Sequence, residues 1–186
     1  MRIFIKMKKE LFVEIEIPEG IEVVFRDETF KTKGPEGENE RKFDLGKLKV
    51  ETSKEKIKIG NVKSTKNDKK RMNTIAAHIK NMIKGVQEKF EYKLKICFGH
   101  FPLNVKQEGN KVIIKNFLGE KINREVKIPE GVEIEIGKEI ISLKSVNKEI
   151  AGQAAANFEA ATKIGGRDKR IFQDGIYIIN KSGKEI

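Results

Sequence analysis

Cysteine, histidine and long apolar runs are scarce in this chain, and each scarcity excludes a class of protein. A single cysteine, Cys97, excludes an internal disulfide framework and a CxxC metal site. No group of His, Cys and carboxylate residues has the spacing of metal ligands. No apolar run approaches the roughly 18–20 residues of a membrane-spanning helix, and the N-terminus does not resemble a signal peptide. We therefore expect a soluble, cytoplasmic protein with no cofactor and no bound metal.

Residues that could catalyse a reaction are few and stand apart from one another. The two histidines are His78, on the flank of an expected helix, and His100, in an expected turn. Both positions favour a structural role. Because Cys97 lies inside an expected strand, we interpret it as a buried core residue and not as a nucleophile. Asp168 and Asp174 are explained by salt bridges and turn capping. The sequence therefore predicts a protein that is not an enzyme.

The balance of charge favours a polyanionic partner. The 186 residues include 39 basic and 28 acidic ones, which gives a formal net charge of +11 and a pI near 9.6. The excess is present on both sides of residue 90, so it does not come from a basic tail. A positive field speeds association with nucleic acid. A lysine-rich solvated surface explains the charge equally well. Because 36% of residues are charged and only 38% hydrophobic, the cores must be thin.

The first half of the chain predicts strands followed by a helix. Residues 13–17 alternate apolar and polar side chains, the pattern of a half-buried strand. Further short strands are expected at 21–25, 30–33, 48–51 and 57–59. A helical stripe then begins, for which Asp68 is the expected N-cap and Gly85 the expected stop. The stripe consists of Met72, Ile75, Ala76, Ile79, Met82 and Ile83.

The second half repeats this order after about 80 residues. Strands are expected at 92–98, 103–106, 111–115, 122–128, 132–136 and 140–143. A helix is expected at 147–164, with Ile150, Ala154, Phe158 and Ala161 on its inner stripe. We interpret the recurrence as an internal duplication of α+β class, with two tandem duplicated domains that each consist of an antiparallel β-sheet packed on one α-helix. The predicted domains are residues 1–87 and 88–186.

A basic turn follows the second helix. Gly165 and Gly166 stop the helix, and Arg167, Lys169 and Arg170 come directly after them. The planar donors of arginine can bind two phosphate oxygens at once. A basic loop of this kind is a solvated surface about as often as it is a site. The Ala-rich stretch 151–156 allows a close approach, either to a neighbouring molecule or to its own sheet.

Several longer motifs resemble the archaeal and eukaryotic branch of the large-subunit ribosomal protein L6 family. They occur in one collinear order over nearly the whole chain, most densely at 72–128 and 147–179. The motifs are His78–Val86 (HIKNMIKGV), Phe90–Lys93 (FEYK), His100–Val105 (HFPLNV), Asn116–Lys121 (NFLGEK) and Phe172–Tyr177 (FQDGIY).

The resemblance implies a structural protein with two α+β domains that binds large-subunit rRNA near the sarcin-ricin loop and the stalk base. Neighbouring ribosomal proteins would lie there, and translational GTPases would dock nearby. It also implies that the C-terminal domain, with its basic loop and tail, makes most rRNA contacts. The expected contacts are Lys115, Asn116, Lys121, Arg167, Lys169, Arg170, Gln173, Gly175 and Tyr177. Glu36 stands where the family often has a basic residue, which weakens the case for an rRNA contact at the 33–37 turn.

Two other functions are alternatives, of which the residues are compatible with the first and disfavour the second. A free-standing RNA-binding regulator or chaperone would use the same basic surfaces. A hydrolase would need a catalytic constellation that the sequence lacks.

Overall fold

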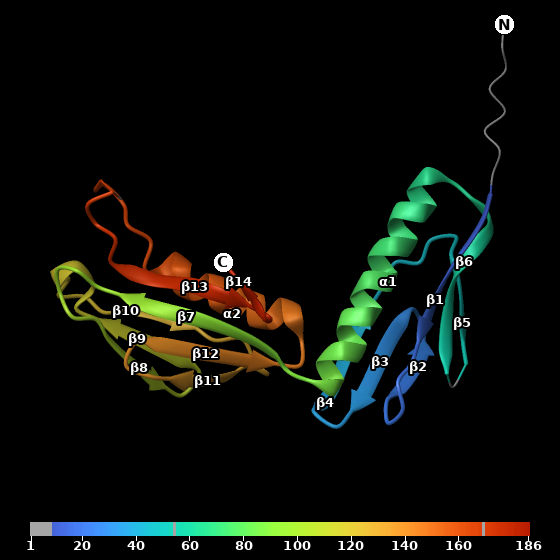
Figure 1. The fold of residues 1–186 in the computed structure, drawn as a ribbon, viewed down its shortest axis with the longest axis horizontal. Coiled ribbons are helices and arrows are strands. Elements are labelled where there is room, and N and C mark those ends of the chain that lie inside the picture. Colours follow the sequence, from blue (N-terminus) through green and yellow to red (C-terminus); the bar gives the residue numbers. More distant parts are fainter. Residues whose placement is uncertain (1–8, 54, 169) are drawn as a thin grey trace, which may run out of the picture. The chain divides into compact units, whose positions relative to one another are not determined.

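The structure is a computed structural model that describes residues 9–53, 55–168 and 170–186 (Figure 1). The chain divides between Glu88 and Lys89 into two compact units, called here the first and the second unit. Within the described part of each unit six strands precede one long helix, and the second unit adds two strands after its helix. Every strand pair in the described residues is antiparallel. The predicted α+β class is confirmed.

Each unit contains two sheets, where the sequence predicted one. In the first unit the orders are β1-β6-β5 and β2-β3-β4. The strands are β1 (Lys9–Glu16), β2 (Glu22–Arg26), β3 (Thr29–Gly34), β4 (Gly37–Lys42), β5 (Lys49–Thr52) and β6 (Lys56–Ser64). The helix α1 (Lys66–Gln87) contacts β1 and β6 of one sheet and β3 and β4 of the other. The core of the unit therefore lies beneath one helix that both sheets share.

Strand β4 was not predicted, because its sequence GENERK contains no apolar residue. It pairs with β3 along its whole length. Two exposed ion pairs cross this ladder: Lys31 Nζ lies 2.7 Å from Glu40 Oε2, and Lys33 Nζ lies 3.0 Å from Glu38 Oε1. Opposite charges across a ladder stabilise a pair of strands modestly. The pairing depends on β3, whose Phe30 is buried, and not on apolar burial by β4 itself.

Both predicted ends of α1 were wrong, although its stripe is confirmed. The N-cap is Thr65, and Asp68 sits at the third helical position, so the two form a capping box. The Thr65 hydroxyl accepts from the Asp68 N–H at 3.3 Å, and the Asp68 carboxylate accepts from the Thr65 N–H at 2.8 Å. Gly85 lies inside the helix, because the apolar stripe continues to the fully buried Val86. All six predicted stripe residues are buried.

The second unit has the same plan with one strand more beside β7. Its sheets have the orders β11-β12-β7-β13-β14 and β10-β9-β8. The strands are β7 (Phe90–Cys97), β8 (Asn104–Glu108), β9 (Lys111–Lys115), β10 (Arg124–Lys127), β11 (Glu133–Ile136), β12 (Ile140–Ser145), β13 (Gly175–Lys181) and β14 (Lys184–Glu185), with a short 3-10 helix η1 (Phe117–Gly119).

The helix α2 (Lys148–Ala161) again contacts both sheets, through β7, β12 and β13 on one side and β10 on the other. Its N-cap is Asn147, and it ends at Ala161, before the predicted 164, with Thr162 as its C-cap. The Thr162 hydroxyl accepts the Ile176 N–H at 3.0 Å and so connects the end of α2 to β13. The buried Ala151, Ala154 and Ala155 are packed against the unit's own core. The small residues of α2 therefore serve internal packing.

The capping box yields a stability prediction. We expect Thr65→Ala to lower the free energy of unfolding by about 1 kcal/mol, because the first turn of α1 loses its side-chain acceptor. Urea denaturation followed by circular dichroism measures the change. Thr74→Ala is the matched control: the exposed Thr74 hydroxyl bonds only to the Lys70 carbonyl within the same helix. Equal losses in the two variants would contradict the capping role.

Candidate nucleic-acid interface

Three loops of the second unit meet at one end of its sheets, the left end in Figure 1. They are residues 98–103 after β7, residues 116–123 between β9 and β10, and residues 162–174 between α2 and β13. Hydrogen bonds join them: Gly99 to Asp174, Asn116 to Pro102, and Arg124 to Ala161. We call these three loops the loop end. It brings together residues that the sequence predicted separately as contacts.

A buried carboxylate fixes two of these loops. Asp174 is only 2% exposed, and it accepts from the Gly99 N–H at 2.7 Å, the His100 N–H at 3.1 Å and the His100 Nδ1 at 2.7 Å. Burial by itself would raise the pKa of Asp174, but the bonds from His100 and Gly99 outweigh it and hold the pKa below its ordinary value. Because an ionised carboxylate only accepts, His100 Nδ1 carries the hydrogen.

Aromatic stacking extends from this pair to a cation. The His100 ring stacks on Phe172, with centroids 4.7 Å apart and an interplanar angle of 23°. The guanidinium carbon of Arg167 lies 4.9 Å from the centroid of Phe172. Such a cation–π contact favours one orientation of the guanidinium group. Arg167 is therefore presented by a chain of contacts that begins at Asp174.

Arg124 fixes the third loop. Its Nη2 donates to Glu120 Oε1 and its Nε to Glu120 Oε2 at 2.8 Å, while Nη1 donates to the Ala161 carbonyl at 2.7 Å. The guanidinium carbon also lies 4.2 Å from the centroid of the buried Phe117 ring. Hydrogen bonding from Arg124 lowers the pKa of Glu120. This clamp joins the 116–123 loop to the end of α2, and sequence reasoning missed it.

Arg170 has a partner within its own loop. Its Nε and Nη2 donate to the two oxygens of Asp168 at 3.2 and 2.9 Å, and the Asp168 carboxylate also accepts the Arg170 N–H. The side-chain bond from Arg170, followed by its backbone bond, lowers the pKa of Asp168. The Arg170 side chain is 90% exposed. It is oriented toward solvent, and its charge is partly balanced by Asp168.

Most of the other predicted contact residues are exposed. Lys115, Asn116, Lys121 and Gln173 are exposed at the loop end. The Asn116 amide is tied to the Pro102 carbonyl at 3.1 Å and has a left-handed φ of 61°. Lys169 lies outside the described residues.

Gly175 and Tyr177 lie at the start of β13. Gly175, which the sequence analysis expected to be a contact, is buried in the structure. A Cβ atom there would meet the Tyr177 ring at 3.0 Å, so Gly175 allows that ring to lie over the strand. Tyr177 itself is 42% exposed. Gly175 is a supporting residue, whereas Tyr177 offers a surface.

Cations outnumber anions in the loop end and the strand residues next to it, and large apolar side chains are exposed beside them. Among the described residues of 98–103, 115–124 and 163–174, the cations are Lys115, Lys121, Arg124, Lys163, Arg167 and Arg170, and the anions are Glu120, Asp168 and Asp174. The exposed apolar residues there are Phe98, Phe101, Ile122 and Ile171. Guanidinium groups and exposed rings are the groups that bind phosphates and unstacked bases.

Comparison with known proteins identifies the family. A family model described as ribosomal protein L6 matches residues 17–89 and 101–175, one match in each unit. The chain belongs to the ribosomal protein L6 family. The paired matches agree with the predicted tandem duplication.

Named relatives of this L6 chain come from archaea, and each is called large ribosomal subunit protein uL6. The relative from Methanobrevibacter smithii is 44% identical over 168 residues, which cover 90% of this chain and 94% of the relative. The one from Methanococcus vannielii is 44% identical over 171 residues, with 92% and 94% covered. The one from Methanosarcina mazei is 44% identical over 176 residues, with 95% and 100% covered. The predicted resemblance to the archaeal and eukaryotic branch is confirmed, and these relatives are of archaeal type.

The remaining candidates for chemistry have structural surroundings in this L6 protein. His78 Nδ1 lies 3.2 Å from Arg41 Nη1, and because arginine only donates, the ring nitrogen accepts. Cys97 is a half-buried free thiol at the end of β7. Across the described residues, no group of His, Cys and carboxylates could hold a metal ion. Within the same residues, none of the helices has the length and apolarity to cross a membrane.

The Asp174 anchor yields a prediction with a pH dependence. We expect Asp174→Asn to lower the free energy of unfolding at pH 7 by about 1–3 kcal/mol, because a buried charge-assisted bond is lost. Since the folded pKa lies below the unfolded value of 3.8, the native carboxylate stabilises the fold above that value. Its contribution disappears as the pH falls through the folded pKa, so the two proteins should converge there.

Urea denaturation from pH 7 to pH 3 measures this difference. Asp168→Asn is the matched control, because its carboxylate lies in an exposed loop and should leave stability nearly unchanged. A difference between wild type and Asp174→Asn that stays constant down to pH 3 would rule out the carboxylate anchor.

Proposed function

We propose that this protein binds large-subunit rRNA near the sarcin-ricin loop and the stalk base, and so supports the region where translation factors bind. At the coarser level it is a structural protein of the large ribosomal subunit and not an enzyme, as its family and relatives indicate. It works at the cytoplasmic ribosome. Its partners are rRNA and neighbouring ribosomal proteins, and we propose stalk-base proteins and translational GTPases among those nearby.

The observation that carries the proposal is the anchored geometry of the loop end. Arg167 is held by Phe172, which stacks on His100, which is bound to buried Asp174. Arg124 ties the neighbouring loop to the same region. Cations that are already oriented lose little side-chain entropy when they bind a phosphate. Such a surface suits permanent binding of a folded polyanion.

Recognition would depend on phosphate and shape. The major groove of an A-form helix is too deep and narrow for side chains to read. We propose direct contacts by Lys115, Asn116, Lys121, Arg167, Lys169, Arg170, Gln173 and Tyr177. Asp168 would pre-orient Arg170 by its bidentate ion pair, and a phosphate would compete for the same donors.

The first unit has a different charge pattern at the β3–β4 turn, which corresponds to the β9–β10 loop of the second unit. Lys31 and Lys33 are paired with Glu40 and Glu38 across β3 and β4. The exposed face of this hairpin therefore carries both signs of charge in alternation, whereas cations are in excess around the 162–174 loop. This supports a role in packing and orientation for the β3–β4 hairpin, and it agrees with the presence of Glu36 at its turn.

A double substitution tests the assignment. We expect Arg167→Ala with Arg170→Ala to weaken binding to an RNA fragment that contains the sarcin-ricin hairpin. The slope of log K against log salt should fall in magnitude by roughly 0.7–0.9 for each phosphate that the variant no longer binds. Fluorescence anisotropy at several salt concentrations gives both quantities. An unchanged slope would remove the two arginines from the contact surface.

The matched control removes the same charge elsewhere. Lys47→Ala with Lys49→Ala takes two exposed cations from the first unit. It should slow association slightly through the weaker overall field and leave the salt slope close to that of the wild type. Co-sedimentation of the native protein with large subunits in moderate salt tests the ribosomal role, and a protein absent from those fractions would be a free-standing regulator instead.

A further inference from the structure

Among its described residues, the first unit has no counterpart of strand β13 of the second unit. The second unit has the order β11-β12-β7-β13, and the first has β5-β6-β1. Strands β1 and β7 both begin their units, and both pair with the strand that precedes the helix. They therefore occupy the same place in the duplicated fold. Beyond β7 lies β13, but no strand in the described residues pairs with the corresponding edge of β1.

Backbone groups of β1 point out of this free edge. The Ile17 N–H donates to the Glu55 carbonyl at 2.8 Å, on the side of β6. In an antiparallel strand alternate residues point their N–H and C=O groups to the same side. Residues 13 and 15 therefore also face β6, and the backbone groups of Glu14 and Glu16 face away from it. These are the groups that an added strand would bind.

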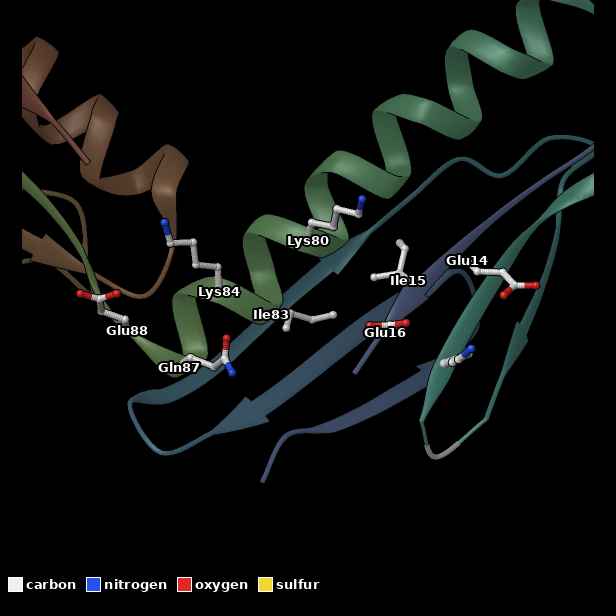
Figure 2. A pocket seen from close by; sticks show the side chains of 9 residues that line it. Glu14, Ile15, Glu16, Lys80, Ile83, Lys84, Gln87 and Glu88 are labelled. Atoms are coloured by element: carbon white, nitrogen blue, oxygen red, sulfur yellow. The ribbon is translucent and has the colours of Figure 1, made fainter. Parts of the chain in front are cut away.

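A groove runs along this edge beneath the second half of α1 (Figure 2). Its volume is about 600 Å³. Glu14, Ile15 and Glu16 line it from β1, and α1 contributes Lys80, Ile83, Lys84 and Gln87. We call it the edge groove.

The edge groove corresponds to the place of β13 in the second unit. There, Ile178 N–H donates to Glu159 and Ile176 N–H to Thr162, both on or just after α2 and both at 3.0 Å. When the alanine pair 76–77 of α1 is aligned with the pair 155–156 of α2, Lys80 takes the place of Glu159 and Ile83 that of Thr162. The helix positions that hold β13 are thus the positions that line the empty groove.

The geometry points to an occupant that is an extended segment of another protein. We propose that it adds to β1 as an antiparallel strand, as β13 does to β7. A side chain that meets Ile15 and Ile83 should be apolar, because Ile176 and Ile178 are buried or half-buried in the same place. The rest of the lining is polar and includes Lys80, Lys84 and Gln87 of α1. Main-chain bonds would supply affinity and the alternating side chains specificity.

The charges on the outer face of β1 indicate which side chains the added strand should carry on that face. Glu14 and Glu16 lie on the outer face of β1, where β6 places Lys58 and Lys56 opposite them. A strand on the other side of β1 would meet the same carboxylates, so lysine or arginine is favoured there. A second copy of β1 would bring its own glutamates against these and is disfavoured. The proposed partner therefore alternates β-branched apolar residues with basic ones.

A peptide titration of the full chain tests this site. The probe is the capped peptide Lys-Ile-Lys-Val-Lys-Ile-Lys, and the readout is the amide spectrum of the ¹⁵N-labelled protein. We expect shifts confined to residues 12–16 and to 80–87. Two control peptides have the same sequence. One is N-methylated at the isoleucines and the valine, which removes the N–H donors from one edge of the extended peptide, and the other is N-methylated at the lysines, which removes them from the opposite edge. The control whose methylated edge faces β1 should bind at least about tenfold more weakly than the probe.

Three outcomes of the titration would overturn the proposal. The first is the absence of any shift at β1, and the second is equal binding of the probe and both methylated peptides. The third is a shift of the β1 amides on addition of the sarcin-ricin RNA fragment, which would make the edge a nucleic-acid surface. Because these tests leave the protein unaltered, none depends on a variant that folds.

A pair of variants separates the edge from its charge. Glu14→Pro removes an outward N–H, which edge strands tolerate, while Glu14→Thr keeps that N–H. Both lose the exposed ion pair between Glu14 and Lys58. We expect Glu14→Pro to weaken peptide binding about tenfold and Glu14→Thr by no more than about threefold. Equal losses would show that the side-chain charge carries binding and would refute strand addition.

Discussion

The sharing of one helix between two small sheets is the constraint on which each unit depends. Because only 38% of the residues are hydrophobic, neither unit can fill a large core. Helix α1 contacts β1 and β3 from different sheets, and α2 contacts β7 and β10 in the same way. A single apolar stripe therefore buries one face of both sheets. The outer faces and the loops remain available for ionic residues, which is how a chain with 36% charged residues can still fold.

The helices and strands that were predicted correctly are those whose apolar residues recur with a regular period. The stripe of α1 and the alternation of β1 follow from side chains that must be buried, and both are present. Strand β4 has no such side chain, and its pairing comes from the neighbouring β3 and from cross-strand ion pairs. The predicted start of α1 is three residues too late, because an aspartate can serve either as the N-cap or as the third helical residue of a capping box, and here the threonine three positions earlier takes the N-cap role. Local polar chemistry is thus harder to predict than burial.

The sequence predicted the site as a set of basic, amide, glycine and tyrosine residues, but it could not predict the contacts that hold these residues in place. His100 and Asp174 lie 74 positions apart, and Arg124 lies 37 positions from Ala161. No local pattern connects such residues, since only the tertiary fold brings them together. The pairing of Arg170 with Asp168, by contrast, spans two positions and was visible in the sequence. Gly175 shows the remaining difficulty, because a glycine in a motif can serve a neighbouring ring and not a ligand.

One difference in chain path accounts for the divergence of the two units. After α2 the chain turns back and pairs with β7 as β13. That return requires the 162–174 segment, which carries Arg167 and Arg170, and it also delivers Asp174 to the loop after β7. After α1 the chain continues instead into β7, so the first unit gains neither a closing strand nor a basic loop. The closed edge and the anchored cations of the second unit therefore have the same origin. In the described residues of the first unit the counterpart of that path is the unpaired edge of β1, where the duplicated scaffold keeps its helix and sheets and has the strand position proposed for another chain.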